Sequence, residues 1–168
     1  IIQQNCQLND IVVVSANGKT TDQLLALYSL ASNTTDEVLD EESSLNETKQ
    51  TLTQALTQEI ADLYALQTDL ITRLLKPSYA KQLAKALAHD FKQLTTWLSG
   101  DLIRHHNDIL SFGEIWSARL LSALLNEKVC PSNSIDSRDF LVIDNEQNCS
   151  VDQTLSAANL KKRRQFGK

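Results

Sequence analysis

The segment LTQALTQEIADLYALQTDLITRLLKPSYAKQLAKALAHDFKQLTTWL, residues 52–98, decides the fold of this chain. In its first part, leucine or isoleucine recurs every three or four residues, which places these side chains on one helix face: Leu52, Leu56, Ile60, Leu63, Leu66, Leu70 and Leu74. A second stripe follows Pro77 and ends before Gly100: Leu83, Leu87, Phe91, Leu94 and Leu98. Proline interrupts a helix, and glycine commonly follows a helix end. We therefore predict helices over 50–75 and 79–98 that pack antiparallel as a hairpin.

Two further helices are predicted, one on each side of the hairpin. Apolar residues at helical spacing cover 21–31 before it and 109–127 after it. Gly113 and Glu114 interrupt the apolar density of the later helix near its start. A glycine inside a helix costs about 1 kcal/mol relative to alanine. Its presence suggests that another part of the backbone approaches closely there. Beyond this helix, 129–136 and 140–144 are candidate strands.

A β-branched run precedes the first predicted helix. The run IVVV, residues 11–14, ends at the turn residues SANG, residues 15–18. A continuous apolar run bounded by turn residues is typical of a strand buried on both faces, so we predict a buried parallel strand over 11–15. Thr20 or Thr21 can cap the helix that follows. The intervening loop would lie at the carboxyl end of the strand, where open α/β sheets bind their ligands.

Composition limits the class of protein. With 168 residues, 42% hydrophobic and 22% charged, the chain resembles one ordinary globular domain. Four glycines and two prolines are too few for an all-β fold, so helix should dominate. The net charge of -5 argues against nucleic acid or an anionic membrane as a partner. The sequence shows neither a membrane-spanning apolar stretch nor a signal peptide, and we expect a cytoplasmic location.

Sulfur-containing residues and the chain ends give two further expectations. Cys6, Cys130 and Cys149 lack metal-ligand spacing, and their odd number fits free thiols in a reducing compartment. The chain contains no methionine, not even at its first position, so we expect a piece of a longer protein. The basic run 161–164 is interpreted as a solvated surface or a linker.

The loop before the first helix contains a partial phosphate-binding signature. Gly18-Lys19-Thr20 matches the end of the P-loop pattern G-x-x-x-x-G-K-(S/T), but that pattern requires glycine where Val13 stands. We therefore reject a P-loop. Hydroxyl groups and helix N-terminal amides still converge at this turn, which leaves anion binding and simple capping as alternatives.

Few other residues indicate chemistry. His105 and His106 are adjacent and point in different directions, so they cannot jointly bind a metal, and we expect no metal site. Glu114 follows Gly113 in apolar company. A carboxylate in such a place must be paired, hydrogen-bonded or neutral, and the alternative is an exposed helical glutamate.

Three stretches, in this order, resemble the aspartokinase family. VVVSANGKTTDQLL, residues 12–25, resembles the family pattern V-V-x-S-A-x-x-x-x-T-(N/D)-x-L. SFGEIWSARLL, residues 111–121, resembles (S/G)-(H/F)-G-E-x-x-S-(A/T)-x-L, and IDSRDFL, residues 135–141, resembles L-D-A-R-(E/D)-F-L. The second stretch is most similar to the aspartokinase part of bifunctional aspartokinase/homoserine dehydrogenases.

This resemblance implies a fold and an activity. The implied fold is α/β: a partial amino-acid-kinase-like αβα sandwich, rich in helix, with a mainly parallel sheet and a long helical hairpin. The implied reaction is transfer of a phosphoryl group from MgATP to the side-chain carboxylate of L-aspartate, the first step toward lysine, threonine and methionine. Ser15, Thr21 and Glu114 map onto positions that contact aspartate. Phe112 stands where many members carry histidine.

The resemblance covers only the amino-terminal part of the family's catalytic domain, residues 1–145 of this chain. The K-F-G-G-(T/S)-S motif, whose lysine neutralises the transferring phosphate, does not occur in the sequence, and neither do the G-F-I and G-R-G-G-S-D segments. We therefore expect residues 1–168 to be a partial, aspartate-binding portion that has no catalytic residue of its own. The nucleotide-binding remainder would lie outside the chain. NADP would be a further cofactor if a homoserine dehydrogenase domain follows, and we expect a homo-oligomer.

A second class of function remains open. The chain could be a non-catalytic helical interaction or regulatory module derived from the kinase fold. The amphipathic hairpin over 52–98 would then be its partner-binding surface, as exposed apolar stripes often are.

Overall fold

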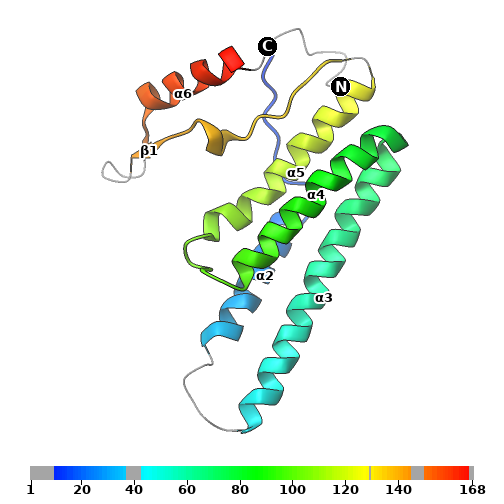
Figure 1. The fold of residues 1–168 in the computed structure, drawn as a ribbon, viewed down its shortest axis with the longest axis vertical. Helices are drawn as coiled ribbons and strands as arrows, with labels where there is room; N and C mark the ends of the chain where they lie inside the picture. Colours follow the sequence, from blue (N-terminus) through cyan, green and yellow to red (C-terminus); the bar gives the residue numbers. More distant parts are fainter. Residues whose placement is uncertain (1–9, 37–42, 129, 145–149, 167–168) are drawn as a thin grey trace. The chain divides into compact units, whose positions relative to one another are not determined.

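The computed structural model describes residues 10–36, 43–128, 130–144 and 150–166. The chain divides into two compact units, Ile1–Ser134 and Ile135–Lys168. The four predicted helices all lie in the first unit (Figure 1). Within the described ranges, no helix is long and apolar enough to cross a membrane.

The first unit is built from α2 (Thr20–Asp36), α3 (Ser43–Leu74), α4 (Pro77–Leu98) and α5 (His106–Glu127). They confirm the four predicted helices, and α2 and α3 are longer than expected. Helix α2 packs against α3 and α5, and α4 packs against the same two helices. The four helices therefore enclose one core, with the predicted α3–α4 hairpin supplying half of it (Figure 1).

Aromatic rings from α4 and α5 fill the centre of this core. Phe91 stacks on Trp116 with ring centroids 4.9 Å apart, and Phe112 lies 5.4 Å from the same indole. Buried aliphatic side chains from all four helices surround the rings: Leu24, Leu27, Leu63, Ile71, Leu87, Leu94, Leu98, Ile109 and Leu120. The predicted stripe of α4 is confirmed, because its last four members are buried.

The predicted stripe of α3 is only partly correct. Leu63 is buried, whereas Leu66 and Leu74 are 43% and 48% exposed. The buried face has members four residues apart: Leu63, Gln67, Ile71 and Leu75. The apolar pattern missed this face because Gln67 is polar.

The predicted buried strand over 11–15 does not form. Residues 10–16 have no regular secondary structure, and Ile11 and Val13 are 77% and 90% exposed. A β-branched run becomes a buried strand only when neighbouring strands satisfy its backbone, and no described strand pairs with it. The expected mainly parallel sheet is therefore not confirmed by this structure.

The second unit is small and mixed. It contains the short 3₁₀ helix η2 (Ser137–Asp139), the strands β1 (Ile143–Asp144) and β2 (Ser150–Val151), and α6 (Gln153–Phe166). The strands pair antiparallel, with Ile143 opposite Val151. Of the two candidate strands, 140–144 contains β1, whereas 130–136 is not a strand and residue 129 lies outside the described part. The basic run predicted as a surface or linker belongs to α6, whose Lys161 and Lys162 are exposed.

A tight turn leads into α2. The amide of Thr20 donates to the carbonyl of Asn17 over 3.0 Å, and Gly18 has a φ of 52°, a left-handed conformation that glycine adopts without strain. The Thr20 hydroxyl donates to the same Asn17 carbonyl over 2.7 Å. Thr20 is thus the first residue of α2 and closes the turn, rather than capping the helix as predicted.

The segment around this turn lies directly on α5 at Gly113. A Cβ on residue 113 would be 2.8 Å from the Cβ of Ala16 and 3.4 Å from Oγ1 of Thr21. Carbon atoms do not approach to 2.8 Å, so only glycine allows this contact without displacement. The close backbone approach predicted from Gly113 is confirmed.

We predict that Gly113→Ala destabilises the chain by about 1–3 kcal/mol, because overpacking outweighs the gain in helix propensity. The Ala16 Cβ is fixed to the backbone and cannot rotate away. Urea unfolding followed by tryptophan fluorescence measures the change. The double variant Ala16→Gly/Gly113→Ala should recover most of the loss, and a more stable Gly113→Ala protein would contradict the packing described here.

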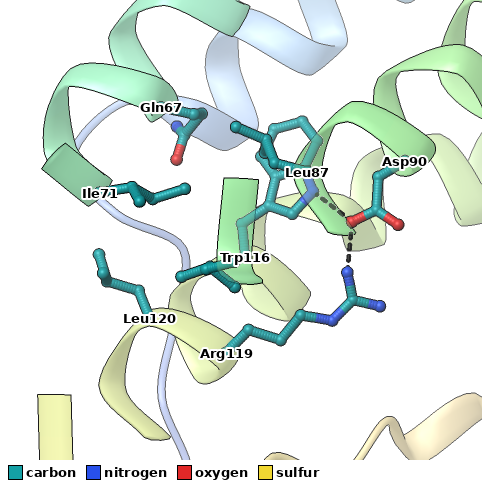
Figure 2. A pocket seen from close by; sticks show the side chains of 8 residues that line it. Gln67, Ile71, Leu87, Asp90, Trp116, Arg119 and Leu120 are labelled. Carbon is teal, nitrogen blue, oxygen red and sulfur yellow. Dashed lines mark hydrogen bonds and ion pairs between the residues drawn. The ribbon is translucent and has the colours of Figure 1, made fainter. Parts of the chain in front are cut away.

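One buried ion pair joins α4 to α5. Asp90 is only 4% exposed, accepts a hydrogen bond from Nε1 of Trp116 over 3.0 Å and pairs with the guanidinium of Arg119 (Figure 2). Removing the carboxylate would leave two donors without their acceptor at the edge of the core.

We expect Asp90→Ala to lower the free energy of unfolding by about 2–4 kcal/mol, since breaking a buried pair strands its partners. Asp69→Ala is the matched control, because Asp69 pairs with Arg73 at the surface, where both side chains are at least half exposed. That variant should cost less than about 1 kcal/mol. If both variants lose the same free energy of unfolding in a denaturant titration, the Asp90 pair contributes no more to stability than the surface pair.

Candidate functional site

The structure brings together two segments that lie far apart in the sequence. Thr21, in the first turn of α2, places its hydroxyl oxygen 3.4 Å from the position that a Cβ on Gly113 would occupy. One turn further along α5, Oγ of Ser117 donates to Oδ1 of Asn17 over 2.7 Å. The junction between the start of α2 and the middle of α5 is therefore the candidate site.

Glu114 directly follows Gly113 in α5. It is half-buried, and its neighbours Phe112 and Ile115 are buried in the core. None of the described residues forms a hydrogen bond or an ion pair with its carboxylate. Of the two alternatives, Glu114 is neither fully exposed nor paired within the described protein, so its charge is available to a cationic group of a ligand.

The two predicted hydroxyl groups lie on either side of the turn. Ser15 precedes it and Thr21 follows it, and both residues are exposed. Among residues with a described position, no hydrogen bond joins Ser15, Thr21 and Glu114 to one another. The structure thus brings Thr21 close to Gly113 and leaves Ser15 exposed, one residue before the Ala16 that packs on Gly113.

A small enclosed cavity inside the first unit adjoins this junction at Gln67, whose amide donates to the Thr20 hydroxyl. It has a volume of about 10 Å³, room for about one water molecule, and Gln67, Asp90, Trp116 and Arg119 are among its lining residues (Figure 2). A second, open depression of about 210 Å³ lies beside Tyr79, Leu83 and Ser134. Both are smaller than the roughly 300 Å³ or more of typical ligand pockets. In this structure the candidate site is therefore a surface junction and not a cavity.

The described histidine and cysteine side chains do not gather into a second site. His105 stacks on Trp97 with ring centroids 4.6 Å apart, whereas His106 forms a T-shaped contact with Tyr28, so the two rings diverge as predicted. Within the described ranges, no three histidine, cysteine, aspartate or glutamate side chains could hold a metal ion together. Cys130 is a free cysteine, and Cys6 and Cys149 lie outside the described residues.

Sequence reasoning missed three polar residues that hold the junction. Asn17 and Ser117 lie inside the two resemblance stretches, but neither was assigned a role. Gln67 is 3% exposed and donates from Nε2 to the Thr20 hydroxyl over 3.1 Å. The only signal for Gln67 was a polar residue within a strongly apolar helix, which by itself indicates nothing about its partner.

Comparison with known proteins agrees with the resemblance. Residues 1–167 match the family described as the Amino acid kinase family. The bifunctional aspartokinase/homoserine dehydrogenase 2 of Escherichia coli (strain K12) is 34% identical to this chain over 157 residues. The match covers 93% of this chain and 17% of that relative, so the chain spans a small part of its length. No solved structure matches at a significant level.

The match extends over nearly the whole chain, and the two stretches that carry the resemblance around Thr21 and Glu114 meet in the structure. The chain belongs to the amino acid kinase family.

Proposed function

We propose that this chain is the amino-terminal, aspartate-binding portion of an aspartokinase catalytic domain. The complete protein would transfer the γ-phosphoryl group of ATP to the side-chain carboxylate of L-aspartate, the first step toward lysine, threonine and methionine. The observation that carries the proposal is that Oγ1 of Thr21 lies 3.4 Å from the position a Cβ on Gly113 would occupy, which brings together the two stretches resembling aspartokinases one residue before Glu114. The expected cytoplasmic location and homo-oligomer are part of the same proposal.

The residues at the junction suit an amino acid ligand that carries both charges. The Glu114 carboxylate would pair with the ammonium group, and its half-buried position would strengthen that pair by excluding water. The hydroxyl groups of Ser15 and Thr21, with amides at the start of α2, would donate to carboxylate oxygens. In phosphoryl transfer the protein mainly positions the reactants and balances charge, so these residues would orient the acceptor without taking part in bond making.

The described residues do not fit MgATP. They present no group of three side chains for a metal ion, and the two cavities described above are too small for a nucleotide. We therefore derive no step through the nucleotide, and we place its binding residues outside this chain. A homoserine dehydrogenase part that uses NADP is proposed only by analogy with the name of the relative.

The alternative of a non-catalytic interaction module has less support. Its partner-binding surface was to be the apolar stripes of the hairpin, but Leu87, Phe91 and Leu94 of the α4 stripe are buried in the core of the first unit. On the α3 stripe, Leu66 and Leu74 are partly exposed, whereas Leu63 is buried. Helices α2 and α5 cover the hairpin face from which the buried side chains project. A partner could reach them only by opening the bundle.

The 168-residue chain alone should not bind ATP. Isothermal titration calorimetry with MgATP should give no saturable heat. The hydrogen-bond donors that would bind the phosphates are missing from this chain, and contacts to other parts of the nucleotide cannot replace them. The complete protein that contains this chain serves as the positive control. A saturable heat with a micromolar Kd for the isolated chain would place the nucleotide site here and contradict the proposal.

In the complete protein, Glu114→Gln should lower kcat/KM for aspartate by about 30-fold to 1000-fold, corresponding to about 2–4 kcal/mol for a stranded charge. Most of the change should appear in the KM for aspartate, and the KM for ATP should change little. Steady-state kinetics with each substrate varied in turn measures this.

The matched control is Glu59→Gln, an equivalent change at an exposed position of α3. It should leave all constants unchanged. If the kcat of Glu114→Gln collapses while the KM for aspartate stays within about twofold, Glu114 acts in the chemical step and its proposed role is wrong. If neither constant moves, Glu114 does not contact the substrate.

A further inference from the structure

Gln67 is an unusual residue for the middle of a core-facing stripe. It lies on α3 four residues before Ile71 and is 3% exposed (Figure 2). Its Nε2 donates to Oγ1 of Thr20, a residue only 2% exposed, and the Thr20 hydroxyl in turn donates a hydrogen bond to the carbonyl of Asn17. A buried amide is costly unless it is hydrogen-bonded, so Gln67 has a defined partner and that partner closes the turn.

Ser117 holds the same turn from the opposite side. It is 6% exposed, and its hydroxyl donates to Oδ1 of Asn17 over 2.7 Å. Ser117 lies four residues after Gly113, so both face the turn from one side of α5. Because Gly113 has no side chain, the segment around Ala16 can pack directly on α5. The hydrogen bond from the Ser117 hydroxyl then holds Asn17 against the same helix.

Apart from these bonds and the packing of Ala16 on Gly113, parts of the turn and of the segment before it are exposed. On its amino-terminal side, Ile11 and Val13 are largely exposed and belong to no described strand. At its centre, Gly18 has nothing within 4 Å of its Cβ position. The hydrogen bonds from α3 and α5 therefore hold the turn together with the packing of Ala16 on Gly113.

We infer that Gln67 and Ser117 are positioning residues, which hold the turn between Ser15 and Thr21 in the place required for the substrate carboxylate. This inference rests on the proposed function. Neither side chain touches the substrate, and both act through backbone and side-chain atoms of Asn17 and Thr20. Binding groups must be held to within about 0.5 Å of their productive position, so loss of one tether should weaken binding of that substrate selectively.

The experiment uses the complete protein and measures steady-state constants for aspartate and ATP separately. Gln67→Met keeps the volume and removes the donor. We expect its KM for aspartate to rise about 3- to 10-fold, the range given by the net value of one hydrogen bond. Its KM for ATP and its kcat should stay within about twofold. Gln54→Met is the matched control, because Gln54 is exposed on the same helix, and it should change nothing.

A double-mutant cycle separates positioning from general stability. Thr20→Val removes the acceptor, so adding Gln67→Met to it should raise the KM for aspartate no further, whatever the melting temperature does. Ser117→Ala deletes a single oxygen and should reproduce the selective rise. It also keeps the inference testable if Gln67→Met fails to fold.

The outcomes distinguish this inference from the proposed function. An unchanged KM for aspartate, or equal rises in both KM values, would show that Gln67 and Ser117 only stabilise the fold. Absence of aspartate-dependent phosphoryl transfer in the wild-type complete protein would overturn the proposed function, and the substrate role of the turn with it.

Discussion

The close approach of two backbones at Gly113 is the constraint on which the candidate site depends. The Cβ of Ala16 lies where a side chain on residue 113 would begin, so the segment that leads into α2 can rest on α5 only because that side chain is absent. Helix α5 is a firm support because Ile109, Phe112 and Trp116 anchor it in the core. The position of Thr21 relative to Glu114 therefore follows from core packing. The packing of the four helices thus sets the geometry of the site.

Polar groups inside the first unit serve as specific connections between helices. Gln67 links α3 to the start of α2, Ser117 links α5 to the turn, and Asp90 links α4 to α5. Each of these side chains is nearly inaccessible to solvent. Leaving a buried polar group without its hydrogen bond costs more free energy than the formed bond contributes to stability. Such bonds favour one arrangement of the helices over alternatives with similar apolar burial. Two of the three connections hold the turn, so the backbone is fixed where the proposed substrate would bind.

Glu114 differs from these residues in having no partner among the described residues. A half-buried carboxylate left unpaired is a cost to the protein alone, and that cost is recovered when a cation binds. This asymmetry separates the structural polar residues from the proposed binding residue. It also explains why the cavity beside Asp90 is a poor candidate, since the charge there is already satisfied by Trp116 and Arg119.

The sequence by itself determined the helices, the hairpin and the family. Helical hydrogen bonds join residues four apart, so apolar spacing, Pro77 and Gly100 were enough to predict α3 and α4. The three stretches that resemble aspartokinases likewise identified the family, because each is a short contiguous sequence motif. The tertiary structure alone decided what depends on distant partners. A strand at 11–15 requires neighbouring strands, which the described chain does not supply. The buried face of α3 includes Gln67, whose partner lies 47 residues away, and Ser117 reaches across 100 residues to Asn17. No local pattern encodes such pairs, because the energy that favours them arises only when the helices pack and remove both groups from water.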